Sequence, residues 1–270
     1  MAWKMSAIIE FFKMSILGLV VLVASACAGP PGDEVHYIDF WPGERVAVSE
    51  AVAIAWQRCD EGRTAQACDS LRNMANAGEP IAQFSFEYAT LFRLNTGRNA
   101  NQAALIEIMR LADAGLPIAQ AVAGQMFLGN TIREADPILA LQYLRAANEA
   151  ESSIAARFLS VAYEEGIGVD VSHEEEIRYL ILAAERGHAR AGYDLAIQYI
   201  RGEKVDQDLD AARTYLRRAA ERGVFVAADG LCTNIYFQLD EESEPLVDSD
   251  EAEMWCRRAA ELQAEPETAY

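Results

Sequence analysis

The sequence predicts an all-α protein, an α/α solenoid of about five to six stacked helix pairs. One observation is a repeated alanine: Ala82, Ala119, Ala155, Ala191 and Ala227 are spaced 37, 36, 36 and 36 residues apart. A second is that apolar residues between these alanines follow helical spacing. A third is that no stretch of useful length alternates apolar and polar residues as a strand would.

The unit from 153 to 187 shows how each repeat is expected to form two helices. The first helix carries apolar residues at helical spacing: Ile154, Phe158, Leu159 and Ala162. It ends at the "GIG" of 166–168, and Ser172 with Glu175 forms a capping box for the second helix. That helix carries a similar set: Ile177, Leu180, Ile181 and Ala184. A pair of this kind cannot bury its apolar face alone, so neighbouring pairs must stack.

Glycines and aromatic residues repeat at the same period. Glycines stand four residues before the repeated alanines, with Glu151 in the remaining slot: Gly78, Gly115, Gly187 and Gly223. Two aromatic series also recur every 36 residues: Tyr143, Tyr179 and Tyr215; and Phe127, Tyr163 and Tyr199. Aromatic residues at a fixed slot indicate the seam between repeats. We therefore expect four tyrosines in the core rather than in a binding groove: Tyr163, Tyr179, Tyr199 and Tyr215.

The N-terminus has the layout of a secretory signal. Lys4 and Lys13 precede an apolar run from 16 to 23, and small residues follow. Glu10 and Lys13 interrupt the only window long enough for a membrane-spanning helix, which needs about 20 apolar residues. We therefore expect residues 1–26 to be a cleaved signal peptide rather than a retained anchor.

The end of this signal, "VASAC", resembles the bacterial lipobox, whose cysteine is lipidated and becomes the mature N-terminus. Ala24 stands where that motif usually has leucine, so ordinary cleavage after a small-x-small triplet is the alternative. The chain has five cysteines, and lipidation of Cys27 leaves an even number in an oxidising compartment. Ala28, by resemblance to lipoproteins without Asp at this position, implies an outer-membrane lipoprotein facing the periplasm. A soluble periplasmic protein is the alternative.

Residues 27–46 are expected to form a tether between membrane and folded domain. Prolines and glycines make a helix or strand there unfavourable: Pro30, Pro31, Gly32, Pro42 and Gly43. Three aromatic residues either dock on the domain or belong to a flexible stalk: Tyr37, Phe40 and Trp41. The solenoid is expected over residues 47–263 and a C-terminal tail over 264–270.

The chain is strongly acidic, with a formal net charge of −19 at pH 7. Loss of Lys4, Lys13 and Glu10 with the signal leaves 21 basic and 41 acidic residues, or −20. Such a surface repels nucleic acid and anionic lipid, and it attracts basic partners. We therefore expect no nucleic-acid partner and membrane contact only through the lipid anchor.

Two stretches carry a resemblance to a known family: "ARFLSVAYEEGIGVDVSHEEEIRYLILAAERGHARA" and "AGYDLAIQYIRGEKVDQDLDAARTYLRRAAERGVFVA". They look like Sel1-like repeats, whose pattern is a helix with A-x-x-x-L and Y-x-x-G, then D-x-x-x-A and an aromatic residue before A-A-x-x-G. The resemblance covers roughly residues 47–263 and is weaker in the units at 80–116 and 117–152. It implies an α/α solenoid related to tetratricopeptide arrays, and it implies no reaction.

The remaining cysteines are expected to form two disulfides, Cys59–Cys68 and Cys232–Cys256. Gly62 can end one helix and Thr64 can begin the next, so Cys59 and Cys68 face each other across a tight turn. Cys232 and Cys256 repeat this logic on either side of the acidic segment near the C-terminus. The bonds would staple the two terminal hairpins, which have a neighbour on one side only.

No catalytic, metal or cofactor site is expected. None of the three histidines lies four residues from another His or Glu in a metal-binding pattern: His36, His173 and His188. The H-E-x-x-H, G-x-S-x-G and phosphate-loop motifs are absent. The carboxylates beside His173 suit a helix N-terminus. The acidic segment 240–253 lacks the oxygen spacing of a calcium loop, so a loose acidic loop is favoured.

The function expected from these observations is a non-enzymatic, monomeric envelope scaffold that binds a protein or peptide of unknown identity through its concave helical surface. The residues that bind cannot be assigned from one sequence. One alternative is a β-lactamase-like or cell-wall-active enzyme, because some secreted cysteine-rich relatives with Sel1-like repeats are described as penicillin-binding or β-lactamase-like. Another is a periplasmic regulator of a sensor kinase or secretion system.

Overall fold

The computed structural model describes residues 36–41, 44–92, 94, 98–128, 136–233 and 247–264. The expected signal peptide, Cys27 and the tail after 264 lie outside these residues, as does the first half of the acidic segment, 240–246. No described helix is both long and apolar enough to cross a membrane.

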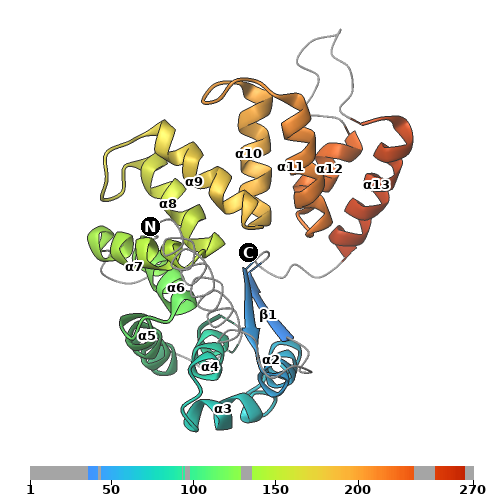
Figure 1. Ribbon diagram of the computed structural model, residues 1–270. Coiled ribbons are helices and arrows are strands. Elements are labelled where there is room, and N and C mark those ends of the chain that lie inside the picture. Colours follow the sequence, from blue (N-terminus) through green and yellow to red (C-terminus); the bar gives the residue numbers. More distant parts are fainter. Residues whose placement is uncertain are drawn as a thin grey trace, which may run out of the picture.

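The described helices form six consecutive antiparallel pairs that wind into an open arc (Figure 1). The first half contains α2 (Glu50–Gly62), α3 (Asp69–Asn76), α4 (Pro80–Phe92), α5 (Arg98–Asp113), α6 (Pro117–Leu128) and α7 (Pro137–Glu149). The second half contains α8 (Ser153–Glu165), α9 (His173–Glu185), α10 (Ala189–Arg201), α11 (Leu209–Glu221), α12 (Phe225–Thr233) and α13 (Ser249–Ala264). The predicted all-α solenoid of helix pairs is therefore confirmed.

Sequence-encoded caps set the helix boundaries. Ser172 caps α9 by accepting a hydrogen bond from the Glu175 backbone N–H at 3.3 Å, as expected. The return half of the expected capping box does not form. The Ser172 N–H donates to the Tyr163 carbonyl instead, and the Glu175 carboxylate pairs with Arg178 at 2.6 Å. The cap therefore ties α9 to α8 as well as starting the helix.

The repeated alanines and aromatic residues build the core between helices. All five alanines at the repeat slot are fully buried. The aromatic series meet in pairs within each unit, with stacked rings: Phe127–Tyr143, Tyr163–Tyr179 and Tyr199–Tyr215. Of the four tyrosines expected in the core, Tyr179 is buried and the other three are half-buried. These rings join the two helices of one unit.

A short antiparallel hairpin precedes the first helix, formed by β1 (His36–Trp41) and β2 (Glu44–Val48). It lies beside α2 on the inner side of the arc (Figure 1). The expectation that prolines and glycines make a strand unfavourable here was wrong for residues 36–41 and 44–46. Pro42 and Gly43 stand between the strands, and the register places Ile38 opposite Val46. Ile38 is 1% exposed and belongs to the core, so this hairpin extends the folded domain into the expected tether.

Both expected cysteine pairs are bonded in the structure. Cys59 in α2 joins Cys68, the residue that precedes α3. Cys232 in α12 joins Cys256 in α13. The bonds link the two helices of the first and of the last pair, where the stack has a neighbour on one side only.

Candidate functional site

The histidines singled out by the sequence do not meet in the structure. His36 lies in β1, and its side chain is outside the described set. His173 lies at the start of α9, and its Nδ1 is 3.0 Å from the Glu176 carboxylate. His188 lies before α10. Within the described ranges, no group of three or more His, Cys, Asp and Glu side chains could hold a metal ion.

His188 is a buried helix cap. Its Nδ1 accepts a hydrogen bond from the Ala191 backbone N–H at 3.1 Å, the role that Ser152 plays for α8 one repeat earlier. Burial, together with the nearby charges of Arg157 and Arg190, lowers the pKa of His188 to about 4. The ring is therefore neutral at neutral pH, as an acceptor at Nδ1 requires.

Glu176 forms a buried ionic cluster that spans two repeats. Its side chain is 2% exposed, and it stands at the slot that Ala140 and Ala212 fill in the neighbouring units. Lys204, from the loop after α10, lies 2.6 Å from this carboxylate and 3.2 Å from Glu164. Burial alone would lower the Lys204 pKa, but the hydrogen bonds to both glutamates raise it. The cluster is a structural tie rather than a reactive site.

The first helices of two neighbouring units each carry apolar side chains that pack against the core and are only partly covered by it. The four residues are half-buried and lie at helical spacing: Phe158 and Val161 on α8, and Tyr193 and Ile197 on α10. Arg157 on α8 and Asp194 on α10 form an ion pair of 2.9 Å that joins the two helices. These six residues are called the α8–α10 surface below.

Polar bridges organise the α8–α10 surface around one carboxylate. Asp194 accepts from Arg157 and also from Arg190, at 3.0 Å. The Arg190 guanidinium in turn lies 5.3 Å from the Tyr193 ring centroid. The arrangement offers apolar contact area with charged groups already paired, which suits a protein or peptide ligand better than a reaction.

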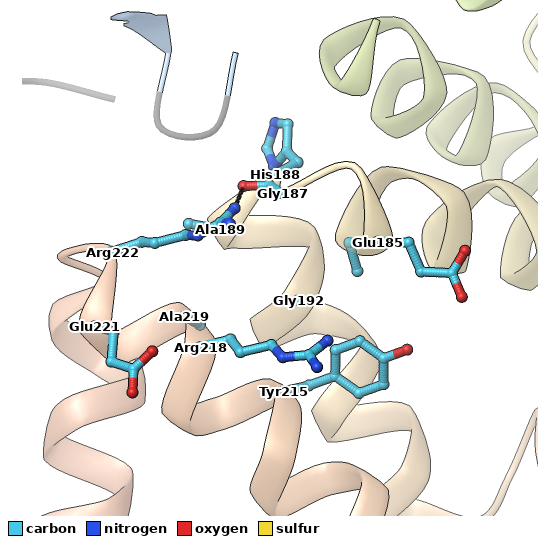
Figure 2. Close-up of a pocket in the computed structure, with 11 residues that line it drawn as sticks. Glu185, Gly187, His188, Ala189, Gly192, Tyr215, Arg218, Ala219, Glu221 and Arg222 are labelled. Atoms are coloured by element: carbon cyan, nitrogen blue, oxygen red, sulfur yellow. Dashed lines mark hydrogen bonds between the residues drawn. The ribbon is translucent and has the colours of Figure 1, made fainter. Parts of the chain in front are cut away.

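A cavity of about 260 Å³ lies where the end of α9 meets α10 and α11 (Figure 2). Its walls include Gly192 on α10 and the charged side chains of α11. In Figure 2 Arg222 reaches the backbone of Gly187, where it donates to the carbonyl oxygen, and Arg218 extends toward the Tyr215 ring. The cavity is thus a polar notch between two repeats.

The chain matches the Sel1 repeat family over residues 117–152, 153–188, 189–224 and 230–263. These four ranges cover more than half of the sequence, and the protein belongs to the Sel1 repeat family. Sel1 repeat proteins are generally non-enzymatic scaffolds that bind other proteins. The comparison with curated proteins gave no match.

Solved structures share the fold. A Sel1 repeat protein from Oxalobacter formigenes has a TM-score of 0.63 at 24% identity, over 78% of this chain and 86% of that one. An immunity protein from Pseudomonas aeruginosa has a TM-score of 0.56 at 19% identity, over 83% and 86%. A protective antigen of uropathogenic Escherichia coli with an SLR fold has a TM-score of 0.51 at 21% identity, over 78% and 53%. These identities show the fold alone.

Sequence reasoning left the binding surface unassigned, and the structure supplies two candidates. The α8–α10 surface could not be read from the repeat pattern, because one sequence does not show which faces are left open. The notch did leave a signal. The residue that follows the repeated alanine is a glutamine in the early units, Gln83 and Gln120. At the same position Gly192 has no side chain.

Proposed function

We propose that this protein is a periplasm-facing scaffold that holds another protein or peptide on its α8–α10 surface. The observation that carries the proposal is this surface: four half-buried apolar side chains on the two helices that the Arg157–Asp194 ion pair joins. Membership of a family of protein-binding scaffolds supports the same class of function. The acidic charge of the chain favours a basic partner.

The location forms part of the proposal. The secretory layout of residues 1–26 and the lipobox-like "VASAC" support an outer-membrane lipoprotein anchored through Cys27. The disulfide pairs are consistent with an oxidising compartment. The hairpin and the first helix pair would then follow the anchor, with the α8–α10 surface further along the chain.

The binding surface is tested by affinity capture from detergent-solubilised envelope, using the mature chain and the variant Tyr193→Ala. A partner held on the α8–α10 surface should be retained by the wild type and reduced several-fold by the variant. Ile138→Ala is the matched control, because Ile138 is 60% exposed on α7, outside this surface. Equal loss in both variants, or no defined partner under several growth conditions, would refute the proposal.

The anchor is tested by labelling cells with radioactive palmitate. The wild-type chain should carry label and the Cys27→Ser variant should not, because the lipid is attached to this thiol. A wild-type chain that carries no label and is recovered from the soluble periplasm would replace the lipoprotein with ordinary signal cleavage.

A further inference from the structure

One slot of the repeat carries a glutamine that closes the junction between units. Gln83, which follows the repeated alanine of its unit, donates from Nε2 to the Ala75 carbonyl oxygen at 3.1 Å. One repeat later Gln120 does the same to the Ala112 carbonyl oxygen, at 3.2 Å. Each bond reaches back eight residues, to the end of the preceding helix. A carboxamide in this slot is therefore a recurring part of the architecture.

The same slot is open in the unit formed by α10 and α11. Gly192 takes the place of the glutamine, and Ala184, eight residues earlier, takes the place of the accepting alanine. Both residues line the notch. A Cβ atom built at Gly192 would meet only the Tyr215 carbonyl oxygen, at 3.7 Å. The notch is thus the space that a glutamine side chain fills in earlier units.

The intervening junction lacks the glutamine and also differs at a second position. Ala156 occupies the slot there, and Leu182 stands at the position that Arg218 takes one repeat later. Leu182 is half-buried against the core. Arg218 is exposed instead and extends over the Tyr215 ring, 5.9 Å from its centroid. The notch therefore differs from the intervening junction at Arg218 as well as at Gly192, and both residues line it.

The notch presents donors and acceptors without a net charge. Glu185 and Glu221 contribute two carboxylates, and Arg218 and Arg222 contribute two guanidinium groups. His188 is neutral at neutral pH. A charged ligand would meet one like charge for each opposite one, whereas a carboxamide can donate to carboxylate or carbonyl oxygens and accept from guanidinium groups.

We propose that the notch at Gly192 is a binding site for a carboxamide side chain, glutamine or asparagine, presented by the protein partner. The chain itself places a carboxamide in the equivalent space twice, and the cavity of about 260 Å³ is large enough to take one from outside. The inference rests on the proposed scaffold function for the source of the side chain. The chemistry of the notch can be measured without that partner.

The test uses N-acetyl-glutamine-N-methylamide as the probe, titrated into the ¹⁵N-labelled mature chain and followed by two-dimensional NMR. Saturable shifts are expected at the backbone amides of Gly187 and Gly192. The capped methionine analogue has similar size but no amide, and it should bind at least fivefold more weakly. Capped glutamate should also bind more weakly, because it adds a third carboxylate. Equal shifts with methionine, or none with glutamine, would overturn the proposal.

Two variants close the notch from opposite sides. Gly192→Gln supplies the residue of the earlier units, and Arg218→Leu supplies the residue found one repeat earlier. Each should weaken binding of the capped glutamine probe at least tenfold without lowering the melting temperature. Gly192→Ala should change the affinity for the probe less than threefold. Undiminished binding by folded Gly192→Gln would refute the site. Such a failure would leave capture through Tyr193 unaffected, so the two proposals can fail separately.

Discussion

At the scale of single residues, the cap of the first helix in each unit shows how one slot accepts different chemistry. Ser152 fills it for α8 with a hydroxyl, and His188 fills it for α10 with a neutral imidazole. Both accept a backbone N–H three residues on, so both satisfy an otherwise unpaired helix donor. Of these two side chains only the imidazole can gain a proton between pH 4 and pH 7, so of these two caps only His188 makes folding depend on pH.

His188 should make the protein sensitive to mild acid. Its pKa falls from 6.5 to about 4 on folding, so the unfolded chain binds the proton more readily. Its contribution is complete above pH 6.5 and is lost as the pH falls toward 4, by up to roughly 3 kcal/mol. His188→Ser, which introduces the side chain of Ser152, should flatten this loss. Urea unfolding at pH 7 and pH 4.5 measures it, and an equal loss in both proteins would contradict the assignment.

At the scale of elements, the turn that joins α7 to α8 differs from the other turns between units, because it has Glu151 where they have a glycine with positive φ. The four glycines at the equivalent slot have φ between 89° and 98°, but Glu151 holds φ at 63° with a side chain attached. Left-handed backbone is unfavourable for residues other than glycine. The helices on both sides pack well enough to impose it, so the strain belongs to the turn rather than to either helix.

Glu151→Gly should therefore stabilise the protein by about 1 kcal/mol. The matched control is Gly115→Ala, which makes the reverse change where an added Cβ meets nothing within 4 Å. It should destabilise by a similar amount, about 1 kcal/mol. Thermal unfolding followed by circular dichroism gives both values. A destabilised Glu151→Gly variant would show that the side chain makes a contact worth more than the backbone strain.

The Glu176 cluster ties α9 to the loop that follows α10. Its contribution to the free energy of unfolding depends on both Glu176 and Lys204. Lys204→Met leaves the 2%-exposed carboxylate with His173 alone, and should cost about 2 kcal/mol. The double variant Glu176→Ala with Lys204→Met restores the alanine of neighbouring units, and should lie within about 1 kcal/mol of wild type. Denaturant unfolding of the double-mutant cycle measures the coupling. Additive effects would show that the pair does not interact.

At the scale of the whole molecule, periodicity in the sequence was enough to predict the stacked pairs, because alanines such as Ala155 and Ala191 can be buried only where helices cross closely. The hairpin was missed because Pro42 and Gly43 disfavour a strand at their own positions, although they separate two strands whose Ile38 and Val46 face the core. The α8–α10 surface was not predictable, since its openness depends on how neighbouring units curve. The notch was predictable in principle from the break at Gly192.

The cysteines give a prediction that joins the fold to the location. Two disulfides account for Cys59, Cys68, Cys232 and Cys256, and only Cys27 is left to report on the N-terminus. Thiol titration of the mature protein, denatured without reductant, should find no free thiol if Cys27 carries lipid. One thiol would show that Cys27 is retained without modification, and four would refute both disulfides.

Removing the first disulfide with Cys59→Ser and Cys68→Ser should lower the free energy of unfolding by about 2–3 kcal/mol, because the short loop that this bond closes still restricts the unfolded chain. Hydrogen exchange should rise first in α2 and α3, which have a neighbouring pair on one side only, and uniform exchange along the arc would contradict a stapling role.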